Sequence, residues 1–178
     1  MPRPILALLV VVLGAGCETL ARNQAELARW QLLADQAMAH AGQPRVIVKP
    51  IGGMAGHYDC RENRVIFGTD NNPRWLLAHE LGHYVMQHCD SQPWEVMLVR
   101  EKAANEFAVT TLQVWGLTEE QAVRDTVLQL LVIKRLTRKV QYGHDYCAEV
   151  LDVLRRHPQV PDPRPAAGDL TCLSGPSR

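Results

Sequence analysis

The chain has 178 residues, of which 47% are hydrophobic, and this is enough for one domain with a sizeable core. Lys and Arg together number 19, Asp and Glu together also number 19, and the formal net charge is zero. Because no block of basic residues stands out, the composition argues against nucleic-acid binding as a main role.

Residues 1–17 have the pattern of an export signal. Arg3 precedes nine apolar residues, and three small residues then lead to Cys17. Such a stretch is too short to span a bilayer as a stable helix. The pattern predicts a lipoprotein signal with Cys17 as the lipidated residue, although Gly14 stands where such signals usually carry Leu. Ordinary signal cleavage and an uncleaved interfacial anchor are the alternatives. We therefore expect an exported protein of the bacterial cell envelope or periplasm, held at a membrane by its N-terminal lipid.

Periodicity and turn residues predict the elements that come before residue 70. An amphipathic pattern ends at Gly42 and Pro44, and Pro50 with the glycines that follow it predicts a loop. The predicted elements are a helix over 20–41, a strand over 45–49 and a hairpin formed by 58–60 and 64–67.

The next predicted helix carries the chemistry. The segment Asn71–Pro73 is a helix-start signal, and apolar residues at helical spacing continue to about Cys89. On this helix His79 and His83 lie four positions apart, about 40° from each other around the axis. Both imidazoles can therefore bind one Zn²⁺, and Glu80 can reach a water on that metal as a general base. The alternative is an ordinary helix whose histidines are surface polar residues.

Zinc needs a third protein ligand, and a predicted helix over 94–115 offers carboxylates. Glu101 falls within the apolar stripe of this helix, where a carboxylate is costly unless something compensates its charge. Glu106 follows Lys102 by four positions and is expected on a solvated face. Glu95, at the helix start, is expected to interact with the helix dipole. We therefore expect Glu101 to be the third ligand.

His88 is the nearest other histidine, but it is not expected in the site. It would lie about 180° from His79 if the helix continues that far, so it would point away. Gly82 would let another segment approach closely beside the two histidines. The expected cofactor is one Zn²⁺ bound by His79, His83 and Glu101.

The C-terminal part is predicted to hold two more helices and a tail. Thr118–Gln121 resembles a capping box, and residues 158–178 contain five prolines and little apolar content. The sequence thus predicts an α+β fold: a mostly helical single domain with a small β-hairpin or sheet before the His79 helix. The expected ranges are helices over 118–139 and 144–156, a signal over 1–17, a folded domain over 18–157 and a tail over 158–178.

Four cysteines remain when Cys17 is set aside. An even number in an exported protein suggests two disulfides, with three possible connectivities. Buried free thiols are the alternative, and a cysteine zinc site is not expected because the sequence has no C-x-x-C pair. The four are Cys60, Cys89, Cys147 and Cys172.

The His79–His83 motif followed by E-K-A-A-N-E-F-A over 101–108 resembles the gluzincin metallopeptidases, in particular the ImmA/IrrE-type and HtpX-type peptidases. The resemblance covers about residues 45–115. It implies a minimal zincin-like fold with Glu101 as a zinc ligand. It also implies that Asn105, where many relatives carry Asp, supports a metal-bound histidine. The hairpin would then be an edge strand along the active-site cleft, and a plain scaffold hairpin is the alternative.

The expected activity is hydrolysis of peptide bonds by a zinc-activated water with Glu80 as the general base. A metalloendopeptidase is expected rather than an exopeptidase, acting on peptides, envelope proteins or peptide cross-links. Tyr142, His144 and Tyr146 are candidates for an oxyanion donor, and His144 is favoured. Two alternatives stay open: a zinc-stabilised envelope binding or assembly lipoprotein without turnover, and a structural lipoprotein without metal.

Overall fold

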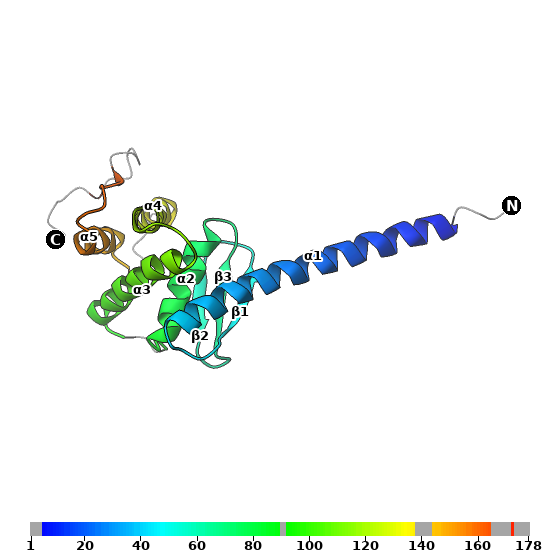
Figure 1. The fold of residues 1–178 in the computed structure, drawn as a ribbon, viewed down its shortest axis with the longest axis horizontal. Coiled ribbons are helices and arrows are strands. Elements are labelled where there is room, and N and C mark those ends of the chain that lie inside the picture. Colours follow the sequence, from blue (N-terminus) through cyan, green and yellow to red (C-terminus); the bar gives the residue numbers. More distant parts are fainter. Residues whose placement is uncertain (1–4, 90–91, 138–143, 165–171, 173–178) are drawn as a thin grey trace.

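The computed structural model describes residues 5–89, 92–137, 144–164 and 172, and over 5–22 and at 137 it describes the backbone alone. The protein is mostly helical with one small sheet (Figure 1), which confirms the predicted α+β class. The predicted lipidation at the Cys17 side chain and the candidate donor Tyr142 lie outside the described residues. The elements are α1 (Ile5–His40), β1 (Ile47–Ile51), β2 (Gly56–Asp59), β3 (Arg64–Gly68), α2 (Pro73–Val85), α3 (Trp94–Val114), α4 (Glu119–Thr137) and α5 (Tyr146–Arg156).

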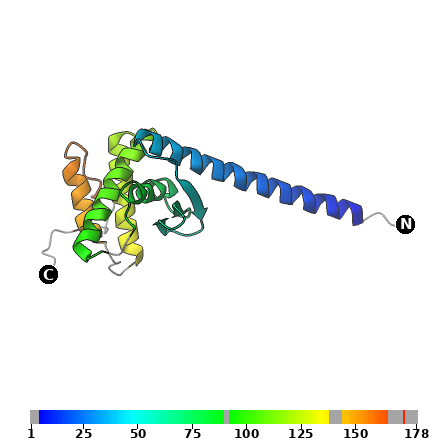
Figure 2. The same ribbon diagram turned by 90° about the horizontal axis from the view of Figure 1, so that it is seen from below.

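Helix α1 is continuous and begins earlier than the predicted start at residue 20. Gly14 and Gly16 do not end it, since a glycine inside a helix costs only about 1 kcal/mol. The first half of α1 projects away from the rest of the molecule, and its C-terminal part packs against β1, α2 and α3 (Figure 1, Figure 2). Among the described residues, no helix is both long enough and apolar enough to cross a membrane.

The sheet has the strand order β1-β3-β2, with β1 parallel and β2 antiparallel to β3. The central strand β3 is the most buried of the three, and its Val65 and Phe67 are fully enclosed. β2 and β3 form the predicted hairpin. β1 includes Pro50, which the sequence analysis placed in a loop. This is possible because β1 is an edge strand, where proline is tolerated.

Helix α2 starts as predicted and ends early. The side chain of Asn72 accepts a hydrogen bond from the backbone N–H of Trp75, and Pro73 is the first helical residue. The helix ends at Val85 rather than near residue 89. Gln87 then adopts a left-handed φ of 53°, which turns the chain back toward the helix.

The three remaining helices, α3, α4 and α5, pack against one another and form the C-terminal part of the described structure. α3 contacts α2, α4 and α5. The predicted capping box is present, because Thr118 and Gln121 exchange backbone-to-side-chain hydrogen bonds of 3.0 and 3.2 Å. Asp145 caps α5 through a 3.0 Å bond from the N–H of Ala148. His144 therefore lies just before this helix instead of forming its first residue.

Two disulfides connect segments that are far apart in the sequence. Cys60 pairs with Cys89, which ties the hairpin turn to the segment after α2. Cys147 pairs with Cys172, which ties α5 to a buried position in the predicted tail. The prediction of paired cysteines is confirmed, and the structure chooses one of the three connectivities. Disulfides are typical of proteins in oxidising, exported compartments.

Candidate metal centre

Helices α2 and α3 lie very close together beside the two histidines. Gly82 faces α3, and a Cβ atom at this position would lie 3.0 Å from the Cα atom of Ala104. This distance is tighter than nearly all real Cβ contacts, so a side chain at Gly82 would push the two helices apart by a few tenths of an ångström. The close packing brings Glu101 of α3 next to His79 and His83 of α2.

Three donor atoms converge between these helices. The Nε2 atoms of His79 and His83 are 3.1 Å apart, and Oε2 of Glu101 lies 3.2 Å from the first and 3.4 Å from the second. Tetrahedral zinc with bonds of about 2.0–2.1 Å has ligand atoms about 3.3–3.4 Å from one another. The spacing of the three atoms therefore fits one zinc ion with a fourth position left for another ligand.

The charge on Glu101 also fits a cation site. Its Oε2 atom is buried, and within the described chain no hydrogen-bond donor is aligned with it. Such an oxygen is costly to bury. Burial disfavours the charged carboxylate, but the adjacent imidazoles of His79 and His83 outweigh burial and hold the pKa of Glu101 below its usual value. A cation between the three side chains would supply the missing partner.

Asn105 lies directly behind His79. Its Oδ1 is 3.0 Å from Nδ1 of His79, and its Nδ2 donates to Oε2 of Glu149 at 2.8 Å. Because a carboxylate only accepts hydrogen bonds, the amide NH₂ group must face Glu149, and Oδ1 then accepts the proton on Nδ1 of His79. A histidine that donates from Nδ1 has an unprotonated Nε2, which is the form that binds a metal.

His83 has a comparable partner in His88, whose Nδ1 is 2.8 Å from Nδ1 of His83. The prediction that His88 points away is wrong, because it assumed that α2 continues through this residue. The turn at Gln87 returns His88 to the ligand side, and the Cys60–Cys89 disulfide holds the next residue. Burial, with repulsion from His83, lowers the pKa of His88 to about 4, so its ring is neutral near pH 7 and its Nδ1 can accept the proton on Nδ1 of His83 when its own proton is on Nε2.

Replacing His88 by alanine is expected to weaken zinc binding by about 10–100-fold, the usual effect of losing a hydrogen-bond partner of a metal ligand. His88→Asn should restore most of the affinity, because Oδ1 of asparagine can take the place of Nδ1 as acceptor. Competition with a chromophoric chelator measures both dissociation constants. His40→Ala, at an exposed histidine at the end of α1 that lines neither hollow, is the matched control. Equal affinities for His88→Ala and the wild type would refute the role of His88.

Glu80 is buried beside the donor atoms and contacts the edge strand β2. A Cβ atom at Gly56 would lie 2.6 Å from its Oε1, so the strand can come this close only as glycine. Burial raises the pKa of Glu80 to about 7; the charge of Glu101 acts in the same direction and His79 opposes it. A carboxylate with a pKa near neutrality is suited to accept and return a proton at pH 7.

The metal-free protein is expected to lose stability as the pH rises, because of Glu80. Its pKa is 4.5 in an exposed chain and about 7 when folded, so its ionisation favours unfolding between these values. The stabilising contribution is complete below pH 4.5 and is lost as the pH passes 7, with a total of about 3 kcal/mol. Urea unfolding of the chelator-treated wild type and Glu80→Gln from pH 4 to 8 measures it. The free energy of unfolding of the variant should rise relative to that of the wild type as the pH increases. A difference between the two that does not change with pH would contradict this expectation.

His144 approaches the site from the segment before α5. Its Nε2 is 3.6 Å from Oε2 of Glu101, and its Nδ1 is 3.2 Å from Oε1 of Glu149. Burial lowers the pKa of His144, but the contact with Glu149 and the charge of Glu101 raise it overall. Of the predicted oxyanion donors, His144 thus lies at the site, and Tyr146 is buried with its ring stacked on His144.

Two hollows meet at the candidate site. One has a volume of about 270 Å³ and is bounded mainly by apolar side chains of α2 and α4. The other has a volume of about 200 Å³ and a more polar wall from β2, α2 and α3. Gly56, His79, Glu80 and His144 line both hollows. A bound chain could therefore extend to either side of the metal centre.

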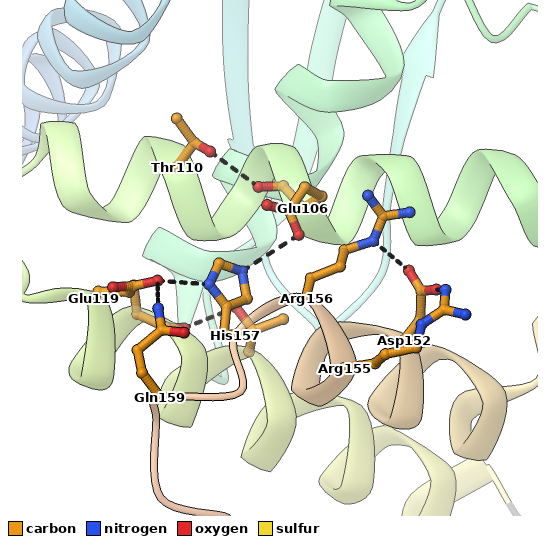
Figure 3. Close-up of polar contacts among 10 residues, drawn as sticks. Glu106, Thr110, Glu119, Asp152, Arg155, Arg156, His157 and Gln159 are labelled. Carbon is orange, nitrogen blue, oxygen red and sulfur yellow. Dashed lines mark hydrogen bonds and ion pairs between the residues drawn. The ribbon is translucent and has the colours of Figure 1, made fainter.

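Glu106, the other carboxylate in the middle of α3, does not join the site. It lies 3.3 Å from Nε2 of His157, and Nδ1 of the same ring lies 2.7 Å from Glu119 (Figure 3). The predicted solvated position of Glu106 is wrong in this respect, because the side chain is half-buried against the segment after α5. No local pattern in the sequence predicts a role for His157.

Sequence reasoning missed two residues of the site, His88 and Glu149. Nothing in the helical pattern could have placed His88, which depends on where α2 ends. Glu149 did have a signal: it shares the helix face of Tyr146 and Val153, both buried. An acid on an apolar stripe is the criterion that selected Glu101, and it applies equally here.

No protein-family model matches this chain, and neither a curated protein nor a solved structure is significantly similar to it. The interpretation of the site therefore depends on its geometry and on the motif in the sequence.

Proposed function

We propose that this protein is a zinc-dependent peptidase in which His79, His83 and Glu101 bind one Zn²⁺. One observation carries the proposal: their donor atoms lie 3.1 to 3.4 Å from one another, and Glu80 lines the same hollow. Three protein ligands with one open position are typical of catalytic zinc. A site that only stabilises a fold is usually closed by four.

The surrounding side chains have the chemistry that peptide hydrolysis needs. Zinc in such a site supplies a water of lowered pKa and an electrophile for the substrate carbonyl. Glu80, with a pKa of about 7, accepts a proton from the attacking water and donates it to the leaving amine. His144, in the form with both ring nitrogens protonated, can donate from Nδ1 to Glu149 and from Nε2 to the negative charge that develops on the carbonyl oxygen.

The proposed substrate is a peptide or protein bound in extended form beside β2. β2 is an edge strand, and its Gly56, His57 and Tyr58 line the polar hollow. Edge strands can add an extended peptide through main-chain hydrogen bonds. Because hollows lie on both sides of Glu80, an internal peptide bond suits the site better than a terminal one. We therefore propose an endopeptidase.

We further propose that the protein acts in the bacterial cell envelope, anchored by a lipid on Cys17. The pattern of residues 1–17 supports this location, and the two disulfides are consistent with it. Substrates within reach would be exported peptides, envelope proteins or peptide cross-links.

A second candidate function is a zinc-stabilised binding or assembly module without turnover. The position of His144 favours it, since Nε2 lies only 3.6 Å from Oε2 of Glu101. A small movement of this ring would add a fourth protein ligand and close the site. The buried base Glu80 would then have no function, which is why the peptidase is the leading proposal.

The test begins with metal analysis of the purified mature protein at neutral pH, followed by incubation with unfolded proteins and quenched peptides. One zinc per chain is expected, with cleavage that stops after chelation and returns with added zinc. Zinc without cleavage would favour the binding module, and a folded protein that takes up no zinc would refute both. Comparing new protein termini in cells that express the wild type or Glu80→Gln would identify the substrates.

A further inference from the structure

One buried carboxylate contacts both sides of the site. Glu149 of α5 is completely buried, and its two oxygens have different partners. Oε2 accepts a hydrogen bond from Nδ2 of Asn105 at 2.8 Å, and Oε1 lies 3.2 Å from Nδ1 of His144. Asn105 in turn contacts His79 at 3.0 Å. A single side chain on α5 is therefore linked to a candidate metal ligand and to the candidate oxyanion donor.

The charge of Glu149 determines which way the Asn105 amide faces in the hydrogen bonds that connect Glu149 to His79. An amide can present either its oxygen or its NH₂ group to a neighbour, and Asn105 alone does not determine which. The carboxylate accepts only, so it holds the NH₂ group of Asn105 and leaves the oxygen for His79. If the amide were reversed, Nδ1 of His79 would have to accept, and its proton would move to Nε2, where it blocks a metal.

The contact between Glu149 and His144 also depends on the fact that a carboxylate only accepts hydrogen bonds. Nδ1 of His144 donates to Oε1 of Glu149, which directs Nε2 toward Glu101. Asp145 caps α5 between these two residues, so the His144 ring and the Glu149 carboxylate are held by one helix end. The orientation of His144 is thus set in part from α5, which carries none of the three metal ligands.

Packing alone does not explain a carboxylate at this position. Burial of a charge is costly, and a glutamine of nearly the same size would avoid this cost. A glutamate can only accept hydrogen bonds, whereas a glutamine can also donate. The amide of a glutamine here could therefore reverse together with that of Asn105. The feature that distinguishes glutamate from glutamine here is therefore its control over proton positions.

We propose that Glu149 is a positioning residue that couples the two sides of the site. Through Asn105 it keeps Nε2 of His79 unprotonated and available to the metal, and directly it orients His144. The identity of the metal rests on the proposed function. The inference itself is about metal affinity and proton position, and it does not require cleavage.

Glu149→Gln is expected to weaken zinc binding by about 10–100-fold, as measured by competition with a chromophoric chelator. The matched control is Asp152→Asn, which removes another buried carboxylate from α5. Asp152 pairs with Arg155 and Arg156 (Figure 3), and it lines neither of the hollows at the metal centre. This control should bind zinc as the wild type does, within about twofold.

A double variant separates the role in positioning from a merely structural one. In Glu149→Gln/Asn105→Asp the carboxylate moves next to His79, where it accepts from Nδ1 without help. Zinc affinity should return to within about threefold of the wild type. The single and double variants bury nearly the same volume, so a loss caused by packing would not be rescued in this way.

The tautomer of His79 gives a readout that needs neither zinc nor substrate. ¹H–¹⁵N NMR of the metal-free wild type should show the proton of His79 on Nδ1, and Glu149→Gln should show a mixture. If both Glu149 variants fail to fold, the wild-type tautomer decides the matter, and a proton on Nε2 overturns the proposal.

The outcomes also separate this inference from the proposed function. Equal zinc affinity in Glu149→Gln and Asp152→Asn, or no rescue in the double variant, overturns the coupling and leaves the peptidase standing. Zinc binding with the expected pattern but no cleavage refutes the peptidase and leaves the coupling standing. A wild type that binds no zinc overturns both.

Discussion

Replacing Glu80 by glutamine is expected to leave zinc bound and to lower kcat/KM for peptide cleavage by about 10²–10⁴-fold, the usual contribution of a general base. Glutamine keeps the size of the side chain that packs against Gly56, but it cannot accept a proton from water. Because Glu80 is not one of the three converging donors, the zinc dissociation constant should change by less than about threefold.

The measurement uses a quenched peptide that the wild type cleaves, with zinc content determined on the same samples. Glu120→Gln, at an exposed position of α4, makes the same chemical change outside the site and should retain full activity. Undiminished cleavage by Glu80→Gln with zinc present would show that another group acts as the base. Loss of zinc together with activity would instead make Glu80 a ligand.

The position of the Glu101 carboxylate beside the two histidines was predictable, because burial of a charge is costly in any fold. Its place on an apolar stripe required a partner, and the two histidines of the motif were the nearest candidates. Gly82 was predictable for a similar reason, since a glycine inside a helix has a cost that a close helix contact offsets. Both positions follow from the local sequence and from the cost of burying a charge or of placing a glycine in a helix. Helical periodicity then predicts that the two residues lie on helix faces that meet.

His88 shows where this reasoning ends. Its position depends on the left-handed turn at Gln87 and on which cysteine pairs with Cys89, and neither follows from helical periodicity. If α2 continued for one more turn, the side chain of His88 would point away from the metal centre. An error in the predicted end of this helix therefore becomes an error in the predicted site. The Glu106–His157 contact is similar, because it joins residues 51 positions apart that no local pattern relates.

Glu101→Gln is expected to reduce zinc affinity by more than about 100-fold, beyond the 10–100-fold typical of losing a residue that only supports a ligand. The substitution keeps the shape of the side chain but replaces an anionic donor by a neutral amide. Two imidazoles with an amide hold a dication weakly, because the site then has no negative charge of its own at the metal.

Glu106→Gln is the matched control for this prediction, since it makes the same change on the same helix at a residue that faces His157. It should bind zinc like the wild type. The metal-free Glu101→Gln protein should remain folded, because glutamine keeps the size and shape of the side chain and can still form hydrogen bonds with the neighbouring imidazoles. Circular dichroism checks the fold, and chelator competition gives the affinity. If Glu101→Gln bound zinc as tightly as Glu106→Gln, the third ligand would have to be another acid. Glu149 and Glu80 would then be the next carboxylates to substitute, since both are buried within the same group of side chains.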